Sequence, residues 1–304
     1  MPNQSVAYLF PTFPMRDAAA SPARIPGYQA ILDRWTEQAG QYIPVSDDLF
    51  DVPDPATVPD LPATLNAHYA CFLEGMAMAE WLGEMRGRPD VVTGYSMGLF
   101  AALCCAGSVT FEDSLAVMAQ ICGNVHQAVE GQHYAMGVVS GLDETEASAC
   151  FAGTVEATDV YSPITIILAG LTTEVTQSLA ACMAAGAEDT MLLPVSAPFH
   201  STALSGIRGA NLAAVETITI VAPEVRVISA ISAAPLKTAE EVRREIIANV
   251  VTPMRWFATM LTVIQSGATA YYECGLSPRL TNVARRMMPE NQNIENFLDF
   301  ELTA

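Results

Sequence analysis

Positive charge is the scarcest property of this sequence. Its 304 residues hold 14 Lys and Arg against 33 Asp and Glu, and Lys237 is the one lysine, so the formal net charge is −19. A chain of this charge repels phosphodiester backbones and anionic lipid headgroups. We therefore expect neither a nucleic acid nor a membrane among its partners.

Long apolar runs and metal-type cysteine spacings are also missing. No apolar run reaches the roughly 18–20 residues that span a bilayer, and residues 1–6 lack the pattern of a signal peptide. The seven cysteines form no CxxC pair and no cluster with histidine. We expect a cytoplasmic protein with reduced thiols, no bound metal and no bound cofactor.

Apolar residues make up 51% of the chain, which is enough for a large core. Short apolar runs, beginning with residues 6–10, predict strands, and they alternate with segments that predict helices. This order favours an α/β fold: a large α/β-hydrolase-like domain with a mostly parallel sheet. Two β-α-β units with one hairpin predict an inserted ferredoxin-like subdomain. We place that subdomain at residues 130–195 and the large domain at residues 1–129 and 196–304.

A Gly-x-Ser-x-Gly motif at residues 94–98 gives the strongest chemical signal. It lies between an apolar strand and an apolar helix, the context in which this motif presents a nucleophile. The hydroxyl of Ser96 is then exposed on a sharp turn. The N–H of Met97 at the helix start can stabilise an oxyanion beside it. Ser96 is therefore the candidate nucleophile.

A serine nucleophile needs a base, and the chain holds only four histidines. His68 and His126 fall within helical segments, where a packed or surface histidine is expected, and His133 lies in a turn. His200 lies in the loop between a predicted strand and a predicted helix. The functional sites of α/β sheets lie at the carboxyl ends of strands, which is where this loop begins. His200 is therefore the candidate base. Its place in mid-chain differs from the residue order of the α/β-hydrolases themselves.

Further short motifs follow one another in a fixed order along the chain. They are Leu9-Phe10-Pro11, Gly94-Tyr95-Ser96-Met97-Gly98-Leu99-Phe100-Ala101-Ala102-Leu103, Ala135-Met136, Ser162-Pro163, Leu168-Ala169-Gly170, Leu193-Pro194-Val195-Ser196-Ala197-Pro198-Phe199-His200, Pro253-x-x-Trp256 and Glu273-x-Gly275. With these motifs the chain resembles the malonyl-CoA:acyl-carrier-protein transacylases and the acyltransferase domains of polyketide synthases. The resemblance runs over nearly the whole chain.

The resemblance implies a Ser96–His200 dyad, with the histidine oriented by the backbone carbonyl of Asn249. It implies oxyanion donors from the backbones of Met97 and Phe13. It also implies ping-pong transfer of an acyl group, supplied by acyl-CoA or by phosphopantetheine, to an acyl carrier protein. Carrier proteins are usually acidic, so a local basic patch must receive one. The arginines of the last quarter of the chain are the candidates: Arg243, Arg244, Arg255, Arg279, Arg285 and Arg286.

The chain departs from the family pattern in four places, and one of them, at Ile121, decides the expected substrate. The family's Gly-Gln-Gly-Ser-Gln is Thr12-Phe13-Pro14-Met15-Arg16 here, its His before the serine is Tyr95, and its Glu after the second glycine is Leu99. Ile121 stands where a gapless count places the arginine that pairs with a malonyl carboxylate. Burying that carboxylate unpaired would cost several kcal/mol. We therefore expect a non-carboxylated acyl group in a cleft without a cation.

We place the acyl pocket at Ile121, Phe199 and Tyr95. Phe199 resembles the residue associated with unbranched α-carbons. Three alternatives stay open: a hydrolase that strips acyl groups from carrier proteins, a malonyl transacylase with a remodelled pocket in which Ile121 is a core residue, and a non-catalytic docking subunit. Access of water to an acyl-serine, which no motif encodes, separates the hydrolase from the transferase.

Overall fold

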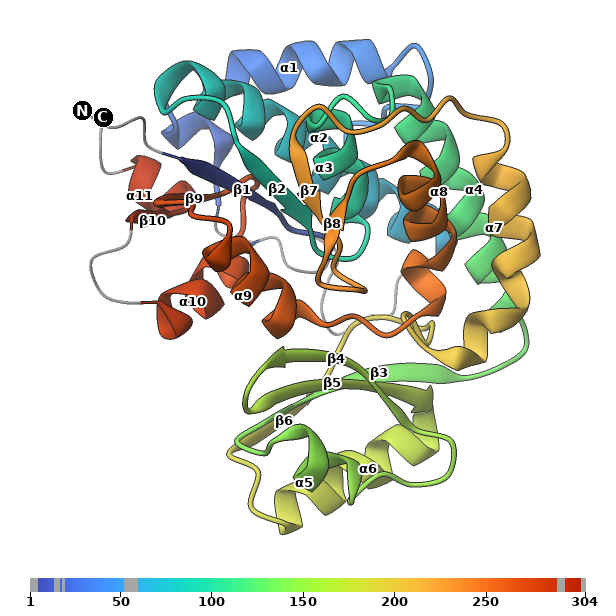
Figure 1. The fold of residues 1–304 in the computed structure, drawn as a ribbon. Helices are drawn as coiled ribbons and strands as arrows, with labels where there is room; N and C mark the ends of the chain where they lie inside the picture. The colour runs from blue at the N-terminus through green and yellow to red at the C-terminus, as the bar shows by residue number, and fades with distance from the viewer. Residues whose placement is uncertain (1–4, 14–16, 18–19, 52–59, 289–292, 302–304) are drawn as a thin grey trace.

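The computed structural model describes residues 5–13, 17, 20–51, 60–288 and 293–301. A large domain is built on a six-stranded sheet and a small subdomain on a four-stranded sheet, which lies below the large domain in Figure 1. The predicted α/β fold with a mostly parallel sheet and an inserted ferredoxin-like subdomain is confirmed. Within the described ranges, no helix combines the length and apolar character needed to cross a bilayer.

The large sheet has the strand order β10-β9-β1-β2-β7-β8. Neighbours pair in parallel except β8, which pairs antiparallel with β7 at one edge. The strands are β1 Val6–Phe10, β2 Val91–Gly94, β7 Arg226–Ile228, β8 Pro235–Leu236, β9 Ala270–Glu273 and β10 Asn293–Glu295. Strands β8 and β10 have two and three residues. Such short strands carry too little periodicity to be predicted.

Both faces of the large sheet are covered, as a parallel sheet requires. Val6, Tyr8 and Phe10 point into the larger core, whereas Ala7 and Leu9 point into a second core on the opposite face. Helices α2, α3, α4, α7 and α8 contribute to the first core, and α9 and α10 to the second. The helices of this domain are α1 Tyr28–Ala39, α2 Leu61–Met85, α3 Gly98–Cys105, α4 Phe111–Val129, α7 Arg208–Val215, α8 Ala239–Ala248, α9 Trp256–Gln265, α10 Arg279–Met287 and α11 Phe297–Glu301.

The small subdomain has the order β-α-β-β-α-β and a core of its own. Its strands pair antiparallel in the spatial order β4-β5-β3-β6. The elements are β3 Tyr134–Ser140, α5 Glu144–Ser148, β4 Glu156–Ser162, β5 Thr165–Leu171, α6 Thr172–Ala184 and β6 Asp189–Leu192. All six lie inside the range 130–195 that the sequence suggests, and the exact limits of that range stay a prediction.

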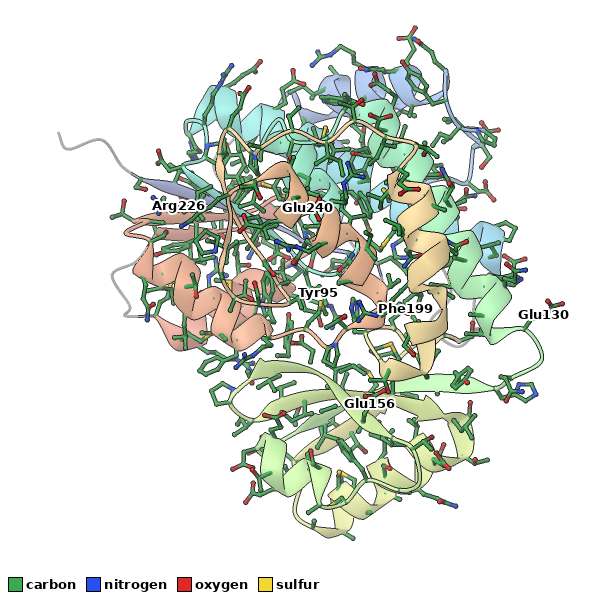
Figure 2. The ribbon with its side chains drawn as sticks, turned by 45° about the vertical axis from the view of Figure 1, so that its right-hand side comes forward. Tyr95, Glu130, Glu156, Phe199, Arg226 and Glu240 are labelled. Carbon is green, nitrogen blue, oxygen red and sulfur yellow. The ribbon has the colours of Figure 1, made fainter. Side chains whose placement is uncertain are left out.

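Strand β4 carries the main polar contacts between the two domains. Glu156 accepts hydrogen bonds from the N–H and the hydroxyl of Thr202, at 2.6 and 2.9 Å. The N–H of Met254 donates to the carbonyl of Thr158 at 2.8 Å. Figure 2 shows Glu156 on the upper edge of the small subdomain, below Phe199 and Tyr95 of the large domain. The subdomain is thus hydrogen-bonded to the face where the strands of the large sheet end.

Two glycines allow the start of α3 to pack against the ends of β1 and β2. A Cβ added at Gly98 would lie 2.3 Å from the carbonyl oxygen of Phe10, and one at Gly94 would lie 2.3 Å from the carbonyl of Gly98. Contacts this short with backbone atoms cannot be relieved by a rotamer change. The glycines of the Gly-x-Ser-x-Gly motif are therefore required by close packing.

Gly98→Ala should lower the free energy of unfolding by about 3 kcal/mol, because the methyl group would separate α3 from β1. Gly123→Ala is the matched control: Gly123 lies inside α4 with open space around its Cα. That change should raise the free energy of unfolding by about 0.5–1 kcal/mol through helix propensity. Urea unfolding measures both. Equal small effects at the two sites would contradict the packing account.

Candidate active site

Ser96 occupies the turn between β2 and α3 in a strained conformation. Its φ is 53°, in the left-handed region that side chains with a Cβ rarely adopt. The side-chain amide of Asn249 donates to the Ser96 carbonyl at 3.0 Å, and the N–H of Leu99 donates to the same oxygen at 3.0 Å. These two bonds hold the turn in place, so the hydroxyl has a defined direction.

His200 is brought to Ser96 from the loop that follows β6. The Nε2 of His200 lies 2.8 Å from the Oγ of Ser96, and its Nδ1 lies 2.7 Å from the carbonyl oxygen of Asn249. A carbonyl only accepts, so Nδ1 carries the proton and Nε2 keeps its lone pair for the serine hydroxyl. His200 also has a positive φ of 60°, and its N–H donates to the Val250 carbonyl at 2.8 Å.

Burial keeps the His200 imidazole uncharged near neutral pH. It lowers the pKa of His200 to about 4, although hydrogen bonds to the backbones of Asn249 and Thr252 act in the opposite direction. An imidazole that is neutral at pH 7 can accept a proton. The arrangement can therefore remove the proton from Ser96 Oγ when an electrophile approaches.

Met97 and Phe13 are the residues whose backbone N–H groups the family resemblance implies as oxyanion donors. Within the described part of the chain, the N–H groups of Met97 and Phe13 donate no hydrogen bond. Both residues line the same cavity as Ser96, and Met97 directly precedes α3. The N–H of Met97, at a helix start and without a partner, can stabilise negative charge on an oxygen bonded to the serine, and the contribution of Phe13 stays a prediction.

The dyad opens on a cavity of about 1110 Å³ between the two domains. Ser96, His200, Phe13, Tyr95 and Phe199 line it together with residues of β3, β4, β5 and α10. Figure 2 shows Tyr95 and Phe199 close to the junction of the domains. Among the described residues, no group of three or more His, Cys, Asp and Glu side chains is placed to hold a metal ion.

Ile121 is not among the residues that line this cavity. It is fully buried on α4 and packs in the larger core of the large domain. An aliphatic side chain gains free energy from burial in an apolar core, and Ile121 is buried there. The sequence assigned Ile121, Phe199 and Tyr95 to one pocket, and the structure brings only the last two together at the cavity.

Two arginines that the sequence suggested only for carrier docking are also among the residues that line the cavity. Arg279 and Arg286 of α10 line it, and both are exposed to solvent at its mouth. Their charges oppose the rise that burial causes in the pKa of Tyr161. Among the described residues, no arginine contributes to the pKa shifts of Tyr95 or His200. The expectation of a cleft without a cation is therefore wrong for the mouth of the cavity.

Tyr95 ties the nucleophile turn to the small subdomain. Its hydroxyl donates to Asp159 Oδ2 at 2.9 Å, and Asp159 Oδ1 accepts the N–H of Trp256 at 2.9 Å. The Tyr95 ring packs edge-on against Tyr161 and Trp256, with centroids 5.5 and 5.2 Å apart. Burial raises the pKa of Asp159 to about 7. One carboxyl thus joins three segments of chain around the cavity.

The sequence profile of the acyl transferase domain matches residues 46–297. The chain belongs to the acyl transferase family. It is 28% identical over 212 residues to the malonyl CoA-acyl carrier protein transacylase of Haemophilus influenzae, covering 68% of each chain. It is 27% identical over 232 residues to the same enzyme of Escherichia coli K12, covering 75% of this chain and 73% of that one. It is also 27% identical over 208 residues to the polyketide biosynthesis protein ThaF of Burkholderia thailandensis, of which it covers 18%.

Solved structures agree on the fold. The malonyl CoA-acyl carrier protein transacylase of Coxiella burnetii superposes with a TM-score of 0.85 at 24% identity, over 99% of this chain and 96% of that one. A malonyl-transacylase solved in complex with a type II polyketide acyl-carrier protein superposes with a TM-score of 0.81 at 23% identity, over 93% of each chain. The acyl transferase fold thus extends across the described chain.

Sequence reasoning missed three side chains of the site: Asp159, His68 and the amide of Asn249. Asp159 lies in a strand without a recognisable motif, and the family resemblance implies a role only for the carbonyl of Asn249. His68 lines the cavity and is 5% exposed. Its position in a helix rich in Ala, Met and Leu indicated burial, but that pattern does not say what the histidine faces.

Asp159→Asn should flatten the dependence of stability on pH. The pKa of Asp159 is raised in the folded protein above the value of about 3.9 for an unfolded Asp. The folded state therefore keeps this proton between about pH 4 and 7, and stability falls as pH rises through that window. Removing the carboxyl should reduce the loss in free energy of unfolding between pH 5 and 8 by about 2 kcal/mol.

Urea unfolding at several pH values measures this effect. Glu130→Gln is the control, because Glu130 is an exposed carboxyl at the end of α4 and should leave the slope unchanged. A slope for Asp159→Asn that equals that of the unmodified protein would contradict the assignment.

Proposed function

We propose that this protein transfers a non-carboxylated acyl group between thioesters, from acyl-CoA or an acyl-carrier protein to a carrier protein, through an acyl-Ser96 intermediate. The observation that carries the proposal is the continuous chain of hydrogen bonds Ser96–His200–Asn249 at the wall of a large cavity. Membership in the acyl transferase family supports the reaction class.

The first half of the reaction forms the ester. Ser96 Oγ attacks the thioester carbonyl while its proton passes to Nε2 of His200, and the N–H groups of Met97 and Phe13 stabilise the oxyanion. Collapse of the tetrahedral intermediate breaks the C–S bond, and the imidazolium protonates the leaving thiolate. In the second half an incoming thiol gives its proton to His200 and attacks the acyl-serine, which regenerates the Ser96 hydroxyl.

The acyl group is proposed to carry no carboxylate. The residue at position 121 is an isoleucine buried in the core, and none of the described arginines acts on the pKa of His200 or Tyr95, the two residues around the reacting hydroxyl. A carboxylate placed there would lose its hydration without a counter-ion, which costs several kcal/mol.

The partner is proposed to be an acidic carrier protein that presents a phosphopantetheine thiol. Arg279 and Arg286 are exposed at the cavity mouth, and neither forms an ion pair with another described residue. Arg285, by contrast, pairs with Asp299, and Arg243 pairs with Glu240. The first two arginines are thus available for phosphate and carboxylate groups. Relatives that carry the name malonyl CoA-acyl carrier protein transacylase support this partner class.

A second candidate follows from the same arginines. A malonyl group that reached toward the cavity mouth could pair with Arg279 or Arg286, and the enzyme would then be a malonyl transacylase with a relocated carboxylate site. The hydrolase and the docking subunit share the fold with both transferases. In the hydrolase, water and not a thiol attacks the acyl-serine, and the docking subunit forms no acyl-serine.

Ser96→Ala and His200→Ala should each reduce acyl transfer by at least about 1,000-fold, because the nucleophile or its base is lost. Intact-mass detection of the acyl-enzyme and transfer to a holo-carrier measure the effect. Ser205→Ala, an exposed serine on the segment Thr202–Ile207, is the control and should be fully active. Undiminished function of Ser96→Ala would favour the docking subunit, and rapid appearance of free acid without a thiol would favour the hydrolase.

Butyryl-CoA should load Ser96 at least about 100-fold faster than malonyl-CoA, measured as kcat/KM of acyl-enzyme formation, because none of the described residues places a cation near the serine to compensate the carboxylate. Faster loading of malonyl-CoA that is lost in Arg279→Gln or Arg286→Gln would establish the second candidate. Arg226→Gln is the control for these variants. Figure 2 shows Arg226 far from Tyr95 and Phe199, and its guanidinium donates a hydrogen bond to the Ser266 carbonyl.

A further inference from the structure

A buried histidine in the wall of the cavity has no hydrogen-bond partner. His68 lies on α2, is 5% exposed and lines the same cavity as Ser96. Both of its ring nitrogens are buried, and neither has a partner among the described residues. A buried polar atom without a partner loses its bonds to water and costs free energy, so most such atoms in folded proteins are paired.

Thr12 shows the same deficit at the same cavity. It is 4% exposed and lines the cavity, and its buried hydroxyl has no partner among the described residues. The next residue, Phe13, packs its ring edge-on against the His68 ring, with centroids 5.8 Å apart. Phe13 also supplies one of the two proposed oxyanion donors. The unpaired groups therefore flank the residue that would hold the thioester oxygen.

The charge state of His68 indicates what it can bind. Burial alone lowers the pKa of His68 to about 4, so its imidazole is neutral at pH 7. A neutral imidazole offers one N–H donor and one acceptor nitrogen, and a threonine hydroxyl also donates and accepts. An alcohol group has the same pair of capacities. A carboxylate would need a cation here, and a fully aliphatic chain would leave His68 and Thr12 unpaired.

We propose that His68 and Thr12 form a hydrogen-bonding subsite for a hydroxyl group on the chain of the transferred acyl group. The proposal rests on the acyl-Ser96 reaction described above and narrows its substrate class from non-carboxylated acyl groups to hydroxyacyl groups. The hydroxyl takes no part in the bond changes: Ser96 Oγ still gains the acyl carbon and the thiolate still leaves with the proton from His200. His68 and Thr12 act on substrate selection alone.

Competition between matched acyl groups tests the subsite. 3-Hydroxybutyryl-CoA and 4-hydroxybutyryl-CoA each differ from butyryl-CoA by one added hydroxyl group. For each of the three, kcat/KM for acyl-Ser96 formation is measured by intact mass. At least one hydroxyacyl-CoA should load about 10- to 100-fold faster than butyryl-CoA, since a site with unpaired polar groups discriminates against a ligand that lacks the partner. Equal loading of all three would overturn the proposal.

Variants of His68 separate recognition from a role in folding. His68→Leu should bring the ratio of hydroxybutyryl to butyryl loading close to one, whereas His68→Gln, which keeps a donor and an acceptor, should retain a preference. His133→Leu is the matched control, because His133 is exposed and does not line the cavity. A preference that survives in His68→Leu would overturn the assignment. So would preferred loading of malonyl-CoA that depends on His68, since the histidine would then serve a carboxylate.

A binding measurement distinguishes this proposal from the proposed reaction. Ser96→Ala cannot form the ester, but its cavity keeps His68 and Thr12. Calorimetry should give a Kd for the preferred hydroxybutyryl-CoA about 10-fold or more below that for butyryl-CoA. Equal Kd values would overturn the subsite even if Ser96 is the nucleophile. Selective binding with no acyl-serine in the unmodified protein would instead overturn the reaction and leave the subsite in place.

Discussion

The close packing of α3 against the end of β1 is the constraint on which the site depends. Gly98 brings the first turn of α3 against the Phe10 carbonyl, and the chain between β2 and α3 must then place Ser96 at a positive φ. Asn249 spans the gap: its side chain bonds the Ser96 carbonyl and its own carbonyl orients His200. One residue from a third segment therefore contacts both the nucleophile turn and the base.

The small subdomain completes the cavity as well as covering it. Asp159 receives hydrogen bonds from Tyr95, next to the nucleophile, and from the first residue of α9. Met254 and Thr202 add two further contacts with β4. A displacement of the subdomain would therefore disturb the aromatic residues beside Ser96. The acyl pocket and the contact between the domains thus depend on the same residues.

The sequence predicted the fold class, the inserted subdomain, the Ser96 turn and His200 because each leaves a local pattern: strand runs, a motif with its flanking elements, or a scarce residue type. It did not predict Asp159, His68 or the arginines of α10 as cavity residues. Their roles arise from the way distant segments meet, and a single sequence does not encode those distances locally. The prediction for Ile121 has the same weakness. A count along the chain identifies the position, but it does not say whether the side chain points to the cavity or to the core.

The placement of Arg279 and Arg286 has a consequence for encounter kinetics. Their two exposed guanidinium groups lie at the entrance of the cavity, in a protein whose net charge is −19. At about 0.01 M salt the Debye length is about 30 Å, so an approaching anion experiences repulsion from the whole acidic surface. At about 0.15 M it is about 8 Å, and only the nearby guanidinium groups act on an anion at the entrance. Moderate ionic strength should therefore speed the capture of an anionic ligand, the reverse of the usual effect for oppositely charged partners.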